Sequence, residues 1–295
     1  MRFRIRHRLR YRYDRPVFLE PTTLRLRPRS DCCQTLHHFE IRVDPEPEGQ
    51  TESLDLDGTS LTQAWFSGLH SGMEVETLTE VETLRTDPYD FIINEESCLR
   101  VPVVWKRDLQ QALASYLFRE SPAAKVDRWA ASIAGAAAGD TGQFLNELNA
   151  AIFRDIEHHI RETGAPLAPE EVLSGKAGAC RDSAVLFMDA CRTQGLPARF
   201  VSGYYYPESE EGPPQLHAWA EVYLPGGGWR GYDPSSGLAA AERHIALAAG
   251  PTASWAAPVT GAFRGTGAQA SMDFDISMQP LPANPAPPES LGIQA

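Results

Sequence analysis

The sequence lacks any long apolar segment: none of its 295 residues lies in a run of about 18 apolar residues, the length needed to cross a bilayer. The arginines near its start are not followed by the apolar stretch of a secretory signal peptide. Both absences predict a cytoplasmic protein without a membrane partner. Hydrophobic residues make up 42% of the chain and charged residues 22%, as in ordinary globular proteins. The length is about twice that of a typical domain and favours two domains.

Cysteines at regular spacing are also missing. The five cysteines, an odd number, form no repeated C-x-x-C motif, so they predict neither a disulfide framework nor a zinc site. They are Cys32, Cys33, Cys98, Cys180 and Cys191. The adjacent pairs His37-His38 and His158-His159 have no acidic partner at ligand spacing, and neighbouring side chains on a strand point in opposite directions. We therefore expect no metal and no cofactor.

Basic residues are outnumbered overall, with a net charge of −12, but they dominate residues 1–43, which hold eleven arginines against four acidic residues. From Arg2 to Tyr13 every second residue is arginine, and the residues between are apolar, aromatic or histidine. Strict alternation is typical of a strand with one buried and one solvated face. We interpret the arginines as the solvated face and expect no nucleic-acid partner, although a basic patch alone would also fit one.

Further alternating segments follow this strand and are separated by short turn signals such as Asp57-Gly58 and Ser71-Gly72. They span residues 23–27, 37–43, 53–57, 61–66 and 73–84. Short strands at this spacing are typical of an antiparallel β-sandwich. The sequence thus predicts a β-sandwich domain over residues 1–105.

The periodicity then changes to that of helices, which predicts a second domain over residues 106–280. We expect helices in 109–117, 126–138 and 144–160, a short one from Pro169, and one from Cys180 to near Gly195. Strands are expected at 198–206, 217–224 and 229–233, so the predicted class is α+β, with a helix packed on an antiparallel sheet. Residues 234–267 look mostly irregular, 272–278 can add a last strand, and the proline-rich residues 281–295 suggest a loose tail.

The stretch before Cys180 is the strongest sign of chemistry. A loop with Gly175 and Gly178 delivers the cysteine to the first turn of an apolar helix, where unpaired N–H groups and the helix dipole favour a thiolate. A nucleophilic cysteine needs a base and a group that orients the base. His217 and Asp233, on successive predicted strands, are the candidates.

The hairpin between these strands determines whether His217 and Asp233 can meet. With a four-residue loop, Asp233 would pair with Ala220 and its carboxylate would point away from His217. With a loop of 225–227, Asp233 faces Trp219 and lies diagonal to His217, about 7–8 Å between Cα atoms, which side chains can bridge. We predict this second register.

Four segments together resemble the bacterial transglutaminase-like family of the papain-like cysteine enzyme superfamily. They are E-E-V-L-S-G-K-A-G-A-C-R-D-S-A (170–184), G-L-P-A-R-F-V-S-G-Y (195–204), L-H-A-W-A-E-V-Y-L-P-G-G-G-W (216–229) and G-Y-D-P-S-S-G (231–237). The resemblance implies that Cys180 is the nucleophile, His217 the base and Asp233 the orienting group. The first hundred residues are similar to the N-terminal domain that often precedes this core in bacterial members.

Two positions depart from the family pattern. Arg181 stands where many members have glutamine; it could contact an anionic substrate or pair with an acid such as Asp182. His158 or His159 stands where members often have tyrosine.

The resemblance and the site chemistry predict a cysteine peptidase or amidase that cleaves an amide bond of a peptide or protein substrate through a thioester. One alternative is transglutaminase-type acyl transfer to an amine, and another is a non-catalytic peptide-binding module. The sequence predicts nothing about the oligomeric state.

Overall fold

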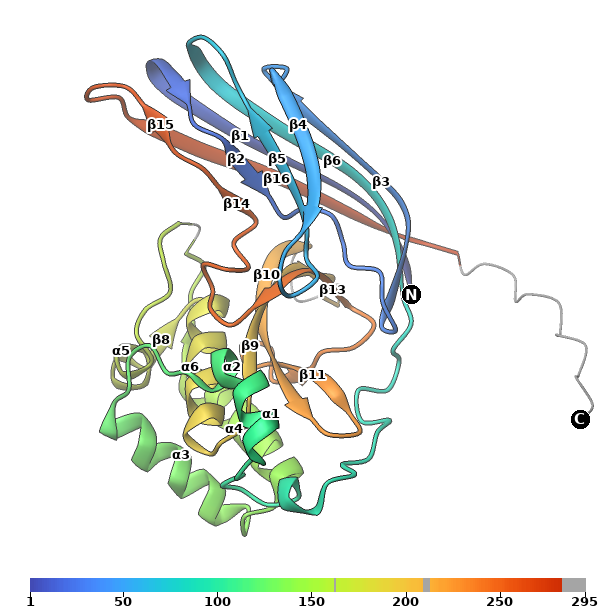
Figure 1. The fold of residues 1–295 in the computed structure, drawn as a ribbon, viewed down its shortest axis with the longest axis vertical. Helices are drawn as coiled ribbons and strands as arrows, with labels where there is room; N and C mark the ends of the chain where they lie inside the picture. The colour runs from blue at the N-terminus through green and yellow to red at the C-terminus, as the bar shows by residue number, and fades with distance from the viewer. Residues whose placement is uncertain (162, 209–212, 283–295) are drawn as a thin grey trace, which may run out of the picture.

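The computed structural model describes residues 1–161, 163–208 and 213–282. Figure 1 shows long strands in the upper part of the molecule, a further sheet below them, and the helices gathered at the lower end. The predicted tail of 281–295 lies outside the described residues from 283 onward; Leu281 still belongs to a strand. Among the described residues, no helix combines the length and apolarity that a membrane span requires.

Two antiparallel sheets form the strand-rich part, and they pack on each other as the predicted β-sandwich. The first sheet has the order β15-β1-β6-β3, with β16 also paired to β1, and the second the order β14-β2-β5-β4. The first contains β1 (Arg2–Leu19), β3 (Gln34–Asp44), β6 (His70–Thr83), β15 (Phe263–Arg264) and β16 (Ala270–Leu281). The second contains β2 (Thr22–Leu24), β4 (Gly49–Leu54), β5 (Ser60–Trp65) and β14 (Val259–Thr260). Leu9, Leu24, Phe66 and Val75 belong to the core between them.

As the alternation in β1 predicts, this strand has one buried face and one face of arginines. Phe3, Ile5 and Leu9 are buried, and the arginines between them face acidic side chains of the neighbouring strands. The ion pairs are Arg2–Glu80, Arg4–Glu80, Arg6–Glu76, Arg8–Glu74, Arg10–Asp273 and Arg12–Asp273. Each arginine of the stripe is therefore paired with an acidic side chain within the protein, which supports the interpretation as a solvated face.

The third sheet carries the expected strands near the predicted positions, in the order β12-β11-β10-β9-β13. Its strands are β9 (Ala198–Tyr205), β10 (Gln215–Leu224), β11 (Gly228–Asp233), β12 (Leu238–Ala239) and β13 (His244–Gly250). Helix α6 (Cys180–Thr193) packs against β9 and β10, as predicted for the α+β core. Helices α6 and α4 share one large apolar core with side chains of β9 and β10, namely Ala198, Phe200, Ala218, Ala220 and Val222.

The remaining elements surround this core. They are a 3₁₀ helix (Glu96–Cys98), α1 (Arg107–Ala112), α2 (Ala114–Leu117), α3 (Ala124–Ala136), α4 (Thr141–Asp155), α5 (Pro169–Gly175) and the parallel pair β7 (Glu157–His158) and β8 (Ala177–Gly178). The helix expected to reach residue 160 ends at Asp155, because residues 157–158 pair with the strand before Cys180 instead.

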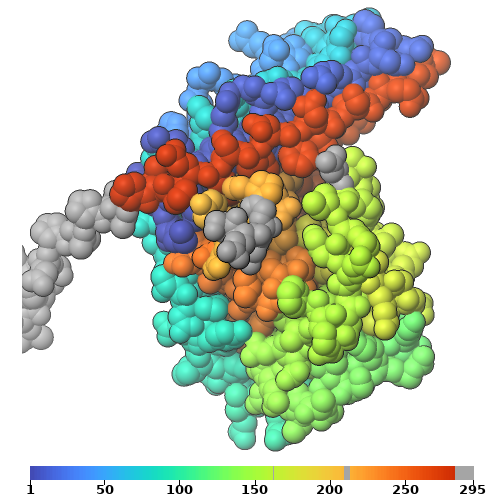
Figure 2. All heavy atoms as spheres, turned by 180° about the vertical axis from the view of Figure 1, so that it is seen from behind, coloured from blue at the N-terminus to red at the C-terminus, as the bar shows by residue number. Residues whose placement is uncertain are grey.

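Two expectations for the last third of the chain are wrong. The segment 234–267 contains β13, whose residues are all buried and pair with β9; its alanines give it little β-propensity. Residues 259–280 were expected in the second domain, but β14, β15 and β16 pair with β2 and β1. The chain thus returns to complete the sandwich, and Figure 2 shows β16 (red) lying beside the blue N-terminal residues above the second region.

The sandwich and the third sheet meet in an apolar layer. Phe3 and Ile5 of β1 pack with Tyr204 of β9 and with Ile245 and Leu247 of β13. Within this layer the Tyr204 hydroxyl and His7 Nδ1 are hydrogen-bonded at 3.0 Å. The two regions are therefore joined by a buried contact.

Candidate active site

The loop before Cys180 is held in place by the buried carboxylate of Asp182. This carboxylate accepts hydrogen bonds from the backbone N–H groups of Ala179, at 2.8 Å, and Leu167, at 2.9 Å, and pairs with Arg161. Ala179 is the residue before the helix and has extended backbone angles. Because Asp182 lies in the first turn, its negative charge also suits the helix dipole. Cys180 therefore begins α6 at a fixed position, as predicted.

Gly178 is required by close packing and not by its backbone angles. A Cβ placed on it would lie 3.0 Å from Cβ of Asp182 and 3.4 Å from Val172. A side chain at residue 178 would push these neighbours by a few tenths of an ångström, so glycine allows the loop to pass closely between α5 and the start of α6.

The hairpin between β10 and β11 has the predicted register. Leu224 pairs with Gly228 and Ala220 with Tyr232, which leaves residues 225–227 as the loop. Continuing this ladder by one residue places Asp233 opposite Trp219 and diagonal to His217.

His217 and Asp233 are in direct contact in the interior. His217 Nε2 lies 2.8 Å from Asp233 Oδ2, and the side chains are 4% and 0% exposed. His217 Nδ1 has no hydrogen-bond partner among the described residues, and Cys180 and His217 line the same cavity. The structure thus brings the three residues singled out in the sequence together.

Two further residues hold the Asp233 carboxylate. His244 Nε2 lies 3.2 Å from the same Oδ2 that His217 contacts, and Oδ1 accepts hydrogen bonds from the Ser235 hydroxyl at 2.7 Å and its backbone N–H at 3.1 Å. The sequence analysis missed both residues. His244 gives no signal because it begins an alanine-rich strand, whereas Ser235 could have been found as a serine two residues after an aspartate in a turn.

The electrostatics favour a charged pair. Burial disfavours ionisation of Asp233, but His217 and His244 outweigh it, so the carboxyl pKa lies well below its ordinary value. Burial would likewise lower the pKa of His217, yet the Asp233 carboxylate and the interaction with Cys180 raise it to about 10. Asp233 is therefore an ionised acceptor, and His217 is an imidazolium at neutral pH.

The pKa of the Cys180 thiol is lowered, whereas that of His217 is raised. Burial alone would raise the pKa of the thiol, but the neighbouring His217 outweighs this, and the pKa is lowered. In contrast, Cys191, on the same helix, has a pKa raised well above its ordinary value by burial. One helix thus carries an activated and an inert cysteine.

A cavity of about 310 Å³ opens beside Cys180 and His217. Its other walls include the apolar side chains of Phe200, Leu216 and Pro258. A site of this size and character can enclose an apolar group next to the sulfur.

The two positions that depart from the family pattern lie near this site. The Arg181 guanidinium donates to the carbonyl of Thr163 at 2.6 Å, while Asp182 pairs with Arg161 instead. His158 pairs with Gly178 in the β7–β8 ladder, two residues before Cys180, and its side chain is exposed.

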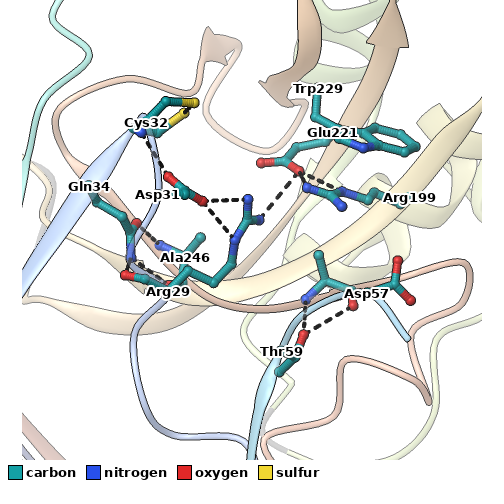
Figure 3. Close-up of polar contacts among 12 residues, drawn as sticks. Arg29, Asp31, Cys32, Gln34, Asp57, Thr59, Arg199, Glu221, Trp229 and Ala246 are labelled. Carbon is teal, nitrogen blue, oxygen red and sulfur yellow. Dashed lines mark hydrogen bonds and ion pairs between the residues drawn. The ribbon is translucent and has the colours of Figure 1, made fainter. Parts of the chain in front are cut away.

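One group among the described residues has side chains close enough to hold a metal ion: the ligand atoms of Asp31, Cys32 and Cys33 all lie within 4.8 Å of one another. Asp31 is already engaged, since its carboxylate pairs with Arg29 and accepts the backbone N–H of Cys33 (Figure 3). This group is separate from the candidate active site.

Figure 3 also shows how the sandwich region contacts the strand that carries His217. Glu221 of β10 is held by Arg199 at 2.6 Å and lies 3.6 Å from Arg29, which reaches it from the N-terminal region. Burial opposes ionisation of Glu221, but both arginines lower its pKa. The Arg199 guanidinium lies 4.3 Å from the ring centroid of Trp229.

A cysteine that begins a helix, packed against an antiparallel sheet with a buried histidine–aspartate pair, is the arrangement of the papain-like cysteine enzyme superfamily. Two family models match this chain: the bacterial transglutaminase-like N-terminal region over residues 3–82 and the transglutaminase-like superfamily over residues 127–234. The chain therefore belongs to the transglutaminase-like superfamily and carries the N-terminal region of its bacterial members.

Individual relatives are similar to this chain over nearly its whole length. An uncharacterised protein of Mycobacterium leprae is 26% identical over 94% of this chain and 98% of its own length, and one of Mycobacterium bovis is 23% identical over 95% and 93%. The crystal structure named "Putative Cysteine Protease" from Cytophaga hutchinsonii has a TM-score of 0.68 at 21% identity and covers 97% of this chain and 93% of its own. That likeness shows the same fold for the sandwich and the core together.

Proposed function

We propose that the protein is a thiol-dependent hydrolase of amide or peptide bonds that uses Cys180, His217 and Asp233 as its catalytic triad. The buried 2.8 Å contact between His217 and Asp233, beside a cysteine at a helix start, carries the proposal. The superfamily and the cysteine-protease name of the Cytophaga structure support it.

In the first half of the reaction, the Cys180 thiolate attacks the carbonyl carbon of the substrate. The carbonyl π electrons move to oxygen, and the backbone N–H of Cys180 is placed to stabilise that oxyanion. When the C–N bond breaks, the imidazolium of His217 gives its Nδ1 proton to the departing amine. The products of this half are a free amine and a thioester on Cys180.

In the second half, neutral His217 takes a proton from water through Nδ1, and the hydroxide attacks the thioester carbonyl. Collapse of the intermediate breaks the C–S bond, releases a carboxylic acid and restores the thiolate–imidazolium pair. Asp233 keeps Nε2 protonated throughout, so that Nδ1 is always the nitrogen that exchanges the proton.

The test compares wild type with Cys180→Ala on a library of peptide and amide substrates in the presence of a primary amine, with products identified by mass spectrometry. We expect hydrolysed products from wild type and none from Cys180→Ala, with thermal unfolding little changed. Cys32→Ala, at an exposed cysteine away from the site, is the matched control and should retain full activity.

The other outcomes separate the alternatives. Amine-coupled products in excess of hydrolysed ones would replace hydrolysis by transglutaminase-type acyl transfer. Retention of peptides by wild type without any covalent product would indicate a binding module. Hydrolysis that persists in Cys180→Ala would contradict the role of the thiol.

A further inference from the structure

A neighbouring cavity along α6 adjoins the cavity beside Cys180. This second cavity of about 320 Å³ lies over Val185, Met188 and Arg192 of the same helix. Both cavities are lined by Ala165, Pro166, Ala253 and Ser254. We call the cavity at Cys180 the proximal cavity, the one over Val185 the distal cavity, and the two together the α6 groove.

The floor of the groove is one stripe of the helix. Arg181, Val185, Met188 and Arg192 follow the spacing of a single helix face, and Arg181, Val185 and Arg192 are all partly exposed. From Cys180 to Arg192 the helix rises about 18 Å, which matches about five residues of an extended chain. The walls are residues 164–169 on one side and 251–258 on the other.

The position of His217 gives the groove a direction. His217 lines the proximal cavity, and no β10 residue is among those that line the distal cavity. The departing amine must lie within reach of His217, because it takes its proton from that ring. The acyl part stays on the sulfur and must extend the other way, along α6.

The two cavities differ in chemistry. Apolar side chains dominate the proximal walls, which include Phe200, Leu216 and Ala256. The charged groups of the distal cavity are largely satisfied within the protein. Arg119 binds Asp189 with two hydrogen bonds of 2.7 Å, and the Arg192 guanidinium donates to the carbonyls of Phe118, Ala198 and Pro251. Selectivity should therefore arise mainly in the proximal cavity.

We infer that the substrate is an extended peptide whose acyl side lies along α6, with an apolar side chain next to the reacting carbonyl seated in the proximal cavity. This inference rests on the proposed function and adds the substrate class and its orientation. It assigns residues 164–169 and 251–258 as the walls that hold the peptide.

The experiment measures alkylation of Cys180 by three reagents with peptide mapping of the modified cysteine. The rate with iodoacetamide depends on the ionised fraction of the Cys180 thiol and not on peptide binding in the groove. The rates with the chloromethyl ketones of Ala-Ala-Phe and Ala-Ala-Glu depend also on the groove, because the thiolate displaces chloride faster when the peptide is bound beside it. The readout is the ratio of the peptidyl rate to the iodoacetamide rate.

Ala165→Trp and Ser254→Trp fill the groove from opposite walls, and both positions are exposed, so neither change disturbs the core. Ala131→Trp, at an exposed position of α3 outside the groove, is the matched control. We expect wild type to prefer the Phe over the Glu reagent by about 10-fold or more, the range for apolar discrimination in a pocket. We expect the ratio for the Phe reagent to fall by about 10-fold in both wall variants and to stay unchanged in the control.

An unchanged ratio in both wall variants, or equal rates with the Phe and Glu reagents, would overturn the α6 groove while leaving the proposed function intact. If Cys180 of wild type reacted with iodoacetamide no faster than a free thiol of ordinary pKa, the proposed function would fall, and the groove with it.

Discussion

Replacing Asp233 by asparagine removes the charge that keeps His217 protonated while preserving the shape of the side chain. A pKa of about 10 for His217, against an ordinary 6.5, corresponds to a preference for the imidazolium of the order of 5 kcal/mol. Burial acts in the opposite direction, so without the carboxylate the pKa of His217 should fall below 6.5. The imidazole would then be neutral at pH 7 and would no longer stabilise the Cys180 thiolate.

The consequence is measurable at the sulfur. The pKa of Cys180, lowered mainly by His217, should rise towards or above its ordinary 9.0 in Asp233→Asn. A thiol of pKa 9.0 is only about 1% ionised at pH 7. The midpoint of the pH profile for iodoacetamide alkylation should therefore move to higher pH, and kcat/KM on any substrate should fall by about 10²- to 10⁴-fold.

Ser235→Ala is the matched control, since it removes a neutral hydrogen bond from the same carboxylate and keeps the charge. Its alkylation profile should stay near that of wild type. Superimposable profiles for Asp233→Asn and wild type, in a variant shown to be folded by its thermal transition, would refute the claim that the carboxylate sets the thiolate–imidazolium pair.

Three further outcomes are expected. His244→Leu should lower kcat/KM by about 10-fold through the lost hydrogen bond to Asp233, and His244→Gln, which keeps a donor, should restore part of it in a steady-state assay. Glu221→Gln should reduce the free energy of unfolding by about 2–4 kcal/mol in urea titrations at pH 7, because it leaves the buried Arg199 without its carboxylate and removes one of the two carboxylates that pair with Arg29. Since the folded pKa of Glu221 is lowered, its contribution is present above its unfolded pKa, near 4.5, and is lost as the pH falls, so wild type and variant should converge in acid. Gly178→Ala should slow Cys180 alkylation at constant pH, because the added Cβ displaces the loop before the helix.

Local rules were sufficient to find the candidate nucleophile and the candidate base. The loop before Cys180 contains glycines, the helix after it has an apolar stripe, and both features are visible in a short window of sequence. The register that brings Asp233 beside His217 followed from strand parity and a loop of three residues. Each inference depended on neighbours within a few residues, which is where sequence patterns carry most information.

The errors all involve contacts between distant segments. β13 was missed because His244 is followed by small residues whose strand conformation depends on pairing with β9. The end of α4 was misplaced because Glu157 pairs with Ala177, twenty residues later. The return of β16 to β1 joins the two ends of the chain, and no periodicity in either segment specifies that partner.

The alternation along β10 explains how the N-terminal region contacts the strand that carries His217. Ala218, Ala220 and Val222 pack into the core that contains α6, so the residues between them, His217, Trp219 and Glu221, lie on the opposite face of the strand. The N-terminal region covers that face.

The covering contacts come from three polar residues of the N-terminal region. Arg29 reaches Glu221, Gln34 exchanges hydrogen bonds of 2.9 Å with the backbone of Ala246, and the Thr59 hydroxyl contacts the backbone of Ala249 at 3.3 Å (Figure 3). These contacts hold the N-terminal region over the sheet that carries the buried side chains of His217, Asp233 and His244. Exclusion of water by itself lowers the pKa of His217, so the raised pKa depends on the charge of Asp233, which acts with less screening in the interior.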